Sequence, residues 1–324
     1  MVTFKSRVLA FIFWGGLFPN LLQAQDTNFV KKYNNLVNLK TFVYNNGLDF
    51  WNKGSGLNYI PGIHSGIGFG AYCKYLPFDF SIRQELSFLD NNRHYHKRKA
   101  TDMQLKGYVG RFAGDIFIQN YQGFYTREVS SYKYLYKGGE EDEENLTFEP
   151  DLNVFQFEAS GKYIFNHDKF SYKAGVTAYE RQLKSAGSLI AGMSFHYLKI
   201  NSDSSLVNIN NSEYLSASNF GINGGYAYNY VFGKRSTLFC STMMGVNLSN
   251  PLYKSVSYND FKVSAAFRFQ LAYWVNFDKW TLGLTGMYSI IHQTFTKNTT
   301  IFVHTRKMEL LLIRRLCYKN GREK

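Results

Sequence analysis

The chain has 324 residues, a net charge of +13 and a mean hydropathy of −0.29. Aromatic residues make up 18% of it, and beyond its first residues it has no long apolar stretch, which excludes a helical membrane protein. The three cysteines, Cys73, Cys240 and Cys317, are too scattered for a disulfide framework or a metal site. The composition leaves a soluble all-β protein, or a membrane barrel whose strands hide their apolar residues by alternation.

The chain opens with the parts of a secretory signal peptide. Basic residues precede a largely apolar run over residues 8–22, and small and polar residues follow it. A membrane-spanning helix needs about 20 continuous apolar residues, more than this run offers. We therefore predict a signal peptide over residues 1–24, cleaved near Ala24/Gln25, and a periplasmic segment over residues 25–37. An uncleaved anchor helix is the alternative.

Four later segments alternate apolar and polar residues with a period of two. They cover residues 63–75, 78–89, 153–165 and 261–276. Because successive side chains of a strand point to opposite faces, one face of each segment would meet lipid and the other the lumen. The last segment exceeds the ~5–6 residues usual for a soluble strand, and it suits a tilted membrane strand of about 9–11 residues with an extension into water. A large β-sandwich also alternates, but we expect its strands to be shorter.

Aromatic residues gather near the ends of the predicted strands. The pairs are Tyr72 with Tyr75, Tyr163 with Phe165, Tyr228 with Tyr230, Tyr273 with Trp274, and Trp280 with Tyr288. Aromatic girdles at the two membrane interfaces are typical of transmembrane barrels, so this placement favours a barrel.

Polar breaks of two lengths separate the predicted strands. The short breaks lie at residues 76–77, 110–114, 166–169, 233–236 and 278–279, and the long ones at 91–99, 128–151, 201–216, 249–259 and 295–300. Short periplasmic turns and longer outer loops give this mixture, although the short–long order fails around residues 181–201. We predict an all-β, antiparallel up-and-down transmembrane barrel of about 12 strands, within a range of about 10–14. It would cover residues 38–318, with a polar tail over 319–324.

Three stretches carry a family likeness. They are IQNYQGFY at residues 118–125, FSYKAGVTAYERQLKSAGSLIAG at 170–192, and NSDSSL at 201–206 with NFGINGGYAYNYVF at 219–232. Through them, the chain over residues 38–313 resembles a Bacteroidetes family of outer-membrane barrels, domain of unknown function four-four-two-one (DUF4421). The resemblance implies an exported barrel and no reaction. Barrels of this kind often end in an aromatic residue, whereas this chain runs on from Leu316 into its polar tail.

The predicted lumen face and rim carry ten polar residues that form our candidate site. They are Arg83, Glu85, Glu158, Lys162, Lys173, Glu180, Arg181, Lys184, Lys262 and Arg268. Such groups could line a water-filled pore and bias it toward anions, or they could pair with one another and plug a narrow barrel. The run over residues 180–185 could likewise be a polar gate or ligand contact, or a rim cluster that pairs its own charges and fixes strand register.

Two predicted loops carry concentrated charge. His94 and His96 open a basic stretch that could ligate a metal, and residues 140–144 form an acidic run that could bind Ca²⁺ or Mg²⁺ weakly. No Cys, Asp or Glu follows closely enough to complete a site with the two histidines, and the acidic run lacks the spaced ligands of a calcium loop. Solvated loops explain both more simply, with the basic one in contact with lipopolysaccharide phosphates. We predict no metal and no cofactor.

The sequence favours a protein without enzymatic activity. Ser194 and His196 share a strand face, where neighbours do not usually face each other as nucleophile and base, and no G-x-S-x-G elbow appears. Export and the lack of a nucleic-acid-binding motif argue against nucleic acid as the partner of this basic chain.

We therefore predict a non-enzymatic barrel of the bacterial outer membrane, either a channel for small polar solutes or a structural barrel. The alternatives are a surface adhesin or complex subunit that uses long outer loops, and a barrel hydrolase. The predicted partners are outer-membrane lipid, lipopolysaccharide and the barrel assembly machinery, and the sequence indicates no particular protein partner.

Overall fold

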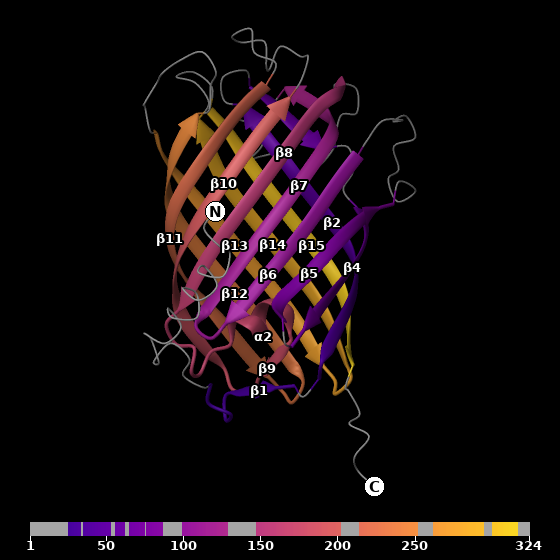
Figure 1. The fold of residues 1–324 in the computed structure, drawn as a ribbon, viewed down its shortest axis with the longest axis vertical. Coiled ribbons are helices and arrows are strands. Elements are labelled where there is room, and N and C mark those ends of the chain that lie inside the picture. Colours follow the sequence, from indigo (N-terminus) through magenta and orange to yellow (C-terminus); the bar gives the residue numbers. More distant parts are fainter. Residues whose placement is uncertain are drawn as a thin grey trace, which may run out of the picture.

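The computed structural model describes residues 25–33, 35–52, 56–61, 65–74, 76–86, 99–128, 147–201, 214–251, 262–294 and 300–316. Twelve long strands make up most of this part of the chain (Figure 1). They are β2 (Val37–Asn52), β4 (Ser65–Cys73), β5 (Leu76–Glu85), β6 (Lys99–Val109), β7 (Phe112–Glu128), β8 (Thr147–Ile164), β10 (Ala186–Asn201), β11 (Tyr214–Phe232), β12 (Ser236–Pro251), β13 (Lys262–Asn276), β14 (Trp280–Thr294) and β15 (Thr300–Leu316). The shorter elements are β1 (Val30–Lys32), β3 (Leu57–Pro61), β9 (Glu180–Gln182) and the helix α2 (Tyr172–Thr177).

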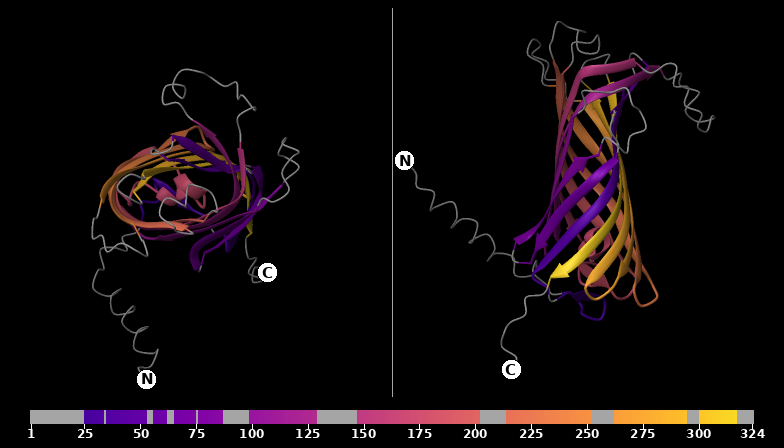
Figure 2. Two further views of the ribbon diagram at one scale, coloured as in Figure 1. Left: turned by 90° about the horizontal axis from the view of Figure 1, so that it is seen from above. Right: turned by 90° about the vertical axis from the view of Figure 1, so that its right-hand side faces the viewer.

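The twelve long strands pair side by side in a ring. Each is antiparallel to its neighbours, and β15 returns to pair with β2 from Ile301↔Asn52 to Leu316↔Val37. This confirms the predicted all-β, antiparallel up-and-down barrel and its expected number of strands. Seen from above, the ring is elongated rather than circular (Figure 2).

The alternation in the sequence decides which way each side chain points. On β5, Phe80 and Ile82 are exposed on the outside of the ring, whereas Ser81 and Arg83 are buried inside it. The other strands of the wall follow the same rule, because a strand turns successive side chains to opposite faces. The apolar sets predicted from the sequence therefore form the outer surface, and the polar sets point into the lumen.

The barrel has two different ends, which we call the turn end and the loop end. At the turn end, β4 and β5, β6 and β7, β11 and β12, and β13 and β14 are joined by connections of two or three residues. The turn at Gly110 and Arg111 is shorter than the predicted break, because Phe112 already pairs with Val109. β1 and the last residues of β15 also lie at the turn end, and the longer connections leave from the loop end (Figure 1).

One connection at the turn end departs from this pattern. Between β8 and β10, residues 165–185 carry α2 and β9 in place of a tight turn, and they fold back into the ring (Figures 1 and 2). The short–long order fails near residues 181–201 because the residues before Ala186 do not belong to the wall. In the described part of the chain, no helix has the length and apolar character needed to cross a membrane.

The predicted aromatic girdle is correct for some residues and wrong for others. Tyr228, Tyr230 and Trp280 are exposed on the outside near the turn end, as expected. Trp274 and Tyr72 instead point into the ring, where only 1% and 7% of their surfaces are exposed. The pattern of aromatic residues could not separate the two groups, because both lie near strand ends.

At the loop end, β3 bridges two strands that are not neighbours nearer the turn end. β2 pairs with β4 as far as Asn45 and with β3 from Phe50 onward. β7 pairs with β6 as far as Gln122 and with β3 from Phe124 onward. Gly123 lies between these partners with a φ of 85°, which a residue with a Cβ atom adopts only with strain. This glycine allows β7 to change partners.

A Gly123→Ala variant is expected to lose about 1–3 kcal/mol of unfolding free energy, because alanine is strained at this positive φ. Urea unfolding of the detergent-solubilised protein, followed by tryptophan fluorescence, measures the loss. Gly161→Ala is the matched control, since an added Cβ there meets nothing within 4 Å. Equal midpoints for the two variants would contradict the role given to Gly123.

Several predicted features lie outside the described residues. They are the signal peptide over residues 1–24, the basic stretch with His94 and His96, the acidic run over residues 140–144, Cys317 and the tail over residues 319–324. Of the other cysteines, Cys73 and Cys240 are free thiols in the wall, and Cys240 is exposed.

Candidate functional site: a plugged lumen

The segment over residues 170–185, which we call the plug, begins with a short helix. The Ser171 hydroxyl accepts a hydrogen bond from the Ala174 N–H at 3.0 Å, which satisfies one of the free donors at the start of α2. The helix ends at Ala178, whose φ of 54° is left-handed. A helix of six residues is not stable alone in water, so contacts with the barrel must hold it.

The side chain of Gln182 forms hydrogen bonds with residues on both sides of α2 in the sequence and with the wall. Its side-chain oxygen accepts from the Ser171 N–H at 3.0 Å and from Asn229 Nδ2 at 3.1 Å. Its side-chain nitrogen donates to the carbonyls of Lys169 and Lys184, at 2.6 and 3.0 Å. Gln182 is only 1% exposed, so loss of this amide would leave buried groups unpaired at a cost of about 1–3 kcal/mol each.

The wall on one side of the lumen holds α2 through three further hydrogen bonds. Trp274 Nε1 donates to the Gly175 carbonyl at 2.6 Å. The Tyr172 hydroxyl donates to Gln270 Oε1 at 3.1 Å. Arg315 on β15 donates to the carbonyl that ends the helix, at 3.2 Å. These bonds explain why Trp274 points inward rather than joining the girdle.

The plug also reaches the strands on the other side of the ring. The Tyr179 hydroxyl donates to Asp79 Oδ1 at 3.0 Å, and its ring stacks on Tyr72 with 4.6 Å between the centroids. Lys173 Nζ donates to the Tyr72 hydroxyl at 2.5 Å and lies 3.7 Å from the Glu180 carboxylate. Because the plug bonds to β4 and β5 as well as to β13, it spans the lumen.

Residues 25–33, which we call the strap, cover the plug at the turn end. β1 of the strap pairs with β9 of the plug over three residues. The Leu183 N–H donates to the Phe29 carbonyl at 2.7 Å. The ammonium groups of Lys169 and Lys184 lie 5.6 and 5.3 Å from the centre of the Phe29 ring, on which they pack. The strap therefore holds the plug from the side facing away from the barrel.

Ten charged side chains from seven strands form ion pairs in the lumen, and we call this group the charge belt. The cations are Lys40, Arg83, Lys162, Arg268 and Lys307, and the anions are Asp79, Asp102, Asp115, Glu158 and Glu309. Every one of these side chains is at most 13% exposed. An unpaired charge is costly in such surroundings, so the equal numbers of cations and anions make this burial possible.

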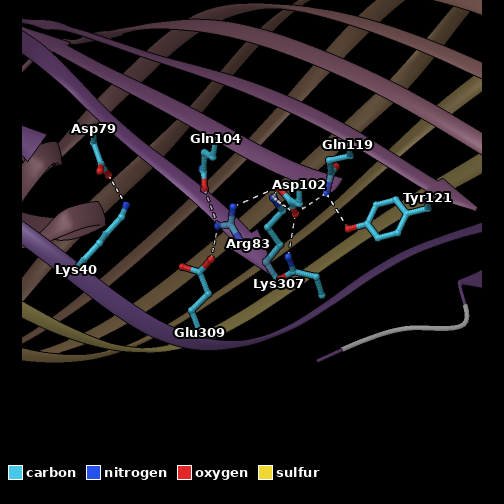
Figure 3. Close-up of polar contacts among 10 residues, drawn as sticks. Lys40, Asp79, Arg83, Asp102, Gln104, Gln119, Tyr121, Lys307 and Glu309 are labelled. Atoms are coloured by element: carbon cyan, nitrogen blue, oxygen red, sulfur yellow. Dashed lines mark hydrogen bonds and ion pairs between the residues drawn. The ribbon is translucent and has the colours of Figure 1, made fainter. Parts of the chain in front are cut away.

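Asp102 on β6 lies at the centre of the largest group in the belt (Figure 3). Its carboxylate accepts from Arg83 and Lys307, each at 3.2 Å. It also accepts from the side-chain amides of Asn46 at 2.9 Å and Gln119 at 3.0 Å. Four donors from four strands therefore converge on one carboxylate.

Two pairs of the belt, Arg83–Asp102 and Lys162–Asp115, join neighbouring strands of the wall, whereas others cross the lumen. Arg83 on β5 pairs with Glu309 on β15, although β2 and β4 lie between these strands in the ring. Arg268 on β13 pairs with Glu158 on β8, with β10, β11 and β12 between them. Glycines such as Gly68 on the inner face of β4 leave the space that inward side chains of β2 occupy.

Apolar clusters lie toward both ends of the lumen. One surrounds the plug and includes Phe170 and Phe239, and the other lies toward the loop end and includes Phe50 and Leu198. Among the described lumen residues, cavities of about 60, 30 and 10 Å³ lie between the side chains. Each has room for only a few water molecules. Apart from a larger cavity of about 270 Å³ at the turn end, the described side chains thus fill the lumen.

The structure places the ten predicted site residues in three regions. Arg83, Glu158, Lys162 and Arg268 belong to the charge belt, and Glu85 lines a small cavity beside Asp102. Lys173, Glu180, Arg181 and Lys184 belong to the plug, where Lys173 pairs with Glu180. Lys262 begins β13 at the loop end, away from the others. Of the two interpretations that the sequence left open, mutual pairing is the one that the belt residues adopt.

The alternation also placed Asp102 on the lumen face, but the sequence reasoning missed Lys307 and Glu309 of the belt and the wall contacts of the plug. A signal for Lys307 and Glu309 was available, because they alternate with the outward residues Met308 and Leu310 on β15. No comparable signal marks Gln182, because its partners lie on segments that are distant in the sequence.

The possible nucleophile and base of a hydrolase both lie on the inner face of β10, as expected. The Ser194 hydroxyl accepts from Asn223 Nδ2 at 3.0 Å. His196 Nδ1 lies 3.7 Å from the carboxylate of Glu158, which also pairs with Arg268. The two side chains engage different partners, so the geometry does not direct His196 at the Ser194 hydroxyl.

The model of the family described as "Domain of unknown function (DUF4421)" matches residues 24–313. No curated protein matches the sequence. The structure is similar to the translocator domain of the autotransporter NalP from Neisseria meningitidis, with 11% identity, a TM-score of 0.43, and 96% of this chain and 98% of that chain covered.

Two further solved structures show a weaker likeness. The outer membrane protease OmpT from Escherichia coli has 5% identity and a TM-score of 0.35, with 87% of this chain and 97% of that chain covered. The Pseudomonas putida toluene transporter TodX has 6% identity and a TM-score of 0.29, with 90% of this chain and 98% of that chain covered. The activities in these names belong to those proteins.

Proposed function

The chain belongs to the DUF4421 family, and from this premise we propose that it is a non-enzymatic barrel of the bacterial outer membrane whose lumen is closed to ions. It acts through its two ends rather than through a continuous pore. The observation that carries the proposal is that ten buried charges pair inside a lumen that the plug spans, and that the pairs Arg83–Glu309 and Arg268–Glu158 cross it.

A permeating ion needs a water-filled path and polar groups that are free to replace its hydration shell. In this lumen, the cations and carboxylates of the belt already neutralise one another. Apolar side chains on either side of the belt would repel both water and ions. Closure therefore follows from the filling of the lumen, with no moving part required.

The outer surface supports a place in the membrane. Ile222 and Leu310 are 65% and 61% exposed on the outside of the wall, and lipid would remove them from water. Short turns at the periplasmic side are the habit of bacterial barrels, so we orient the turn end toward the periplasm. On this basis the partners are outer-membrane lipid and lipopolysaccharide around the wall, and the barrel assembly machinery during insertion.

Current recording across planar bilayers tests the closed lumen. We expect the purified protein to give no steady current steps at any salt concentration or voltage, with flotation of proteoliposomes as the control for insertion. Current steps whose size rises with salt concentration would overturn the proposal.

A gated conduit for small polar solutes is the second candidate, and the charge belt favours it. Replacing buried ion pairs with apolar residues of similar volume is often neutral or stabilising. Ten charges are therefore not needed simply to fill a lumen, and they would suit a polar solute if the plug moved aside. Variants of the plug separate the two candidates, as described below.

A further inference from the structure

A cavity of about 270 Å³ lies at the turn end, between the plug and the wall. Its lining comes from the plug, from the strap, and from the turn-end parts of β2, β4, β6 and β7. It is several times larger than the cavities inside the belt. Its volume is close to the lower limit of about 300 Å³ for small-molecule sites, so it suits a ligand with one sugar ring.

Two buried amides line this cavity with unused hydrogen-bonding atoms. Gln25 and Asn38 are 7% and 1% exposed. Within the described part of the chain, Gln25 Nε2 and Asn38 Oδ1 have no hydrogen-bond partner. A buried polar atom left without a partner costs about 1–3 kcal/mol. One of these atoms donates and the other accepts, so a ligand with hydroxyl groups, which do both, would satisfy the pair.

The lining of the cavity also carries positive charge. Lys32 and Lys74 line it and are exposed to solvent, and neither pairs with an acid among the residues that the structure describes. Lys173 lies in the same lining, but Glu180 neutralises it. Burial lowers the pKa of His167, so this ring adds no charge near pH 7. Two uncompensated ammonium groups therefore favour an anionic ligand.

We propose that this cavity binds a sugar that carries a carboxylate. The hydroxyl or amide groups of the sugar would bond to Gln25 and Asn38, and the carboxylate would lie between Lys32 and Lys74. With the turn end in the periplasm, such a ligand would come from the periplasm. The inference deepens the proposal that the protein acts through its ends, and it rests on that orientation but not on closure of the lumen.

Isothermal titration of the full, folded chain in detergent micelles tests the ligand class. The probes are N-acetylmuramic acid, N-acetylglucosamine, which has the same ring without the carboxylate, and inorganic phosphate, which has the charge without the ring. We expect N-acetylmuramic acid to bind at least tenfold more tightly than either of the others. Equal affinity for the two sugars, equal affinity for phosphate, or no binding of N-acetylmuramic acid would overturn the proposal.

Two variants locate the site. Lys74→Met is expected to weaken N-acetylmuramic acid binding about tenfold and to leave N-acetylglucosamine binding unchanged, as expected when one charge-assisted contact is lost. Lys279→Met is the matched control, because Lys279 is an exposed lysine at the turn end that does not line the cavity. Asn38→Ala is expected to weaken the binding of both sugars.

If Asn38→Ala fails to fold, the comparison of Lys74→Met with Lys279→Met still decides the outcome. Equal effects of these two lysine variants would place the ligand elsewhere and overturn the proposal. Current recordings and binding measurements give separate readouts, so failure of the closed lumen and failure of the sugar site can be told apart.

Discussion

Gly175→Val is expected to displace the plug and to lower the free energy of unfolding by about 1–3 kcal/mol, as overpacking of a filled core usually does. A Cβ atom at this position would lie 2.1 Å from Phe239 Cδ2 and 2.7 Å from Asn229 Oδ1. Phe239 and Asn229 are 1% and 0% exposed, so neither has room to move away. The shift of the helix would also break the bond between Trp274 and the Gly175 carbonyl.

Urea unfolding of the solubilised barrel measures this loss, and a red shift in tryptophan emission reports the release of Trp274. Gly161→Val is the matched control, because position 161 faces outward and has open space around it. A Gly175→Val variant with the unfolding midpoint of the control would show that the plug does not depend on close contact with the wall.

The same variant separates the two candidate functions. In a closed barrel, Gly175→Val stays silent in planar bilayers, because the belt and the apolar cluster toward the loop end are still in place. In a gated conduit, loosening the plug produces current steps that the wild-type chain lacks. Such steps would favour the conduit over the closed barrel.

Asp102→Ala is expected to destabilise the barrel by about 3–5 kcal/mol, the usual cost of removing one partner from a buried ion pair. Among the described residues, the change removes the only carboxylate within ion-pair distance of Lys307 and leaves Glu309 as the one acidic partner of Arg83. It also leaves the amides of Asn46 and Gln119 without this acceptor. Because all of these groups are remote from water, solvent would not replace the lost bonds easily.

Unfolding midpoints in urea test this prediction against Asp278→Ala, which removes an exposed aspartate from a turn. The double variant Asp102→Ala with Lys307→Met is expected to recover part of the loss, because it removes one of the stranded cations. If Asp102→Ala were no less stable than the Asp278 control, the belt would not contribute to stability as proposed.

The wall of the barrel could be predicted because its signal is local. Each strand repeats every two residues, so the inward residues Arg83, Glu158 and Arg268 could be assigned from their immediate neighbours. The strand count followed from the spacing of the breaks. The one failure of that spacing, near residues 181–201, coincides with the segment that folds inward rather than along the wall.

The plug could not be predicted because its contacts join residues that are far apart in the sequence. Trp274 reads as a girdle residue, and only its bond to Gly175, 99 residues away, shows otherwise. The stretch over residues 170–192, which carries the most specific part of the family likeness, includes the whole plug. The family likeness therefore covers the plug but did not predict that this segment folds into the lumen.

The sequence by itself determined that the chain forms a membrane-type barrel with a polar, charged interior. The alternation assigns the side chains of each strand to the lipid face or the lumen face, and this assignment does not depend on the other strands. Only the tertiary structure decided how the charges of this interior pair with one another. That pairing depends on Arg83 meeting Glu309 and Arg268 meeting Glu158, which lie on strands that are not neighbours in the ring.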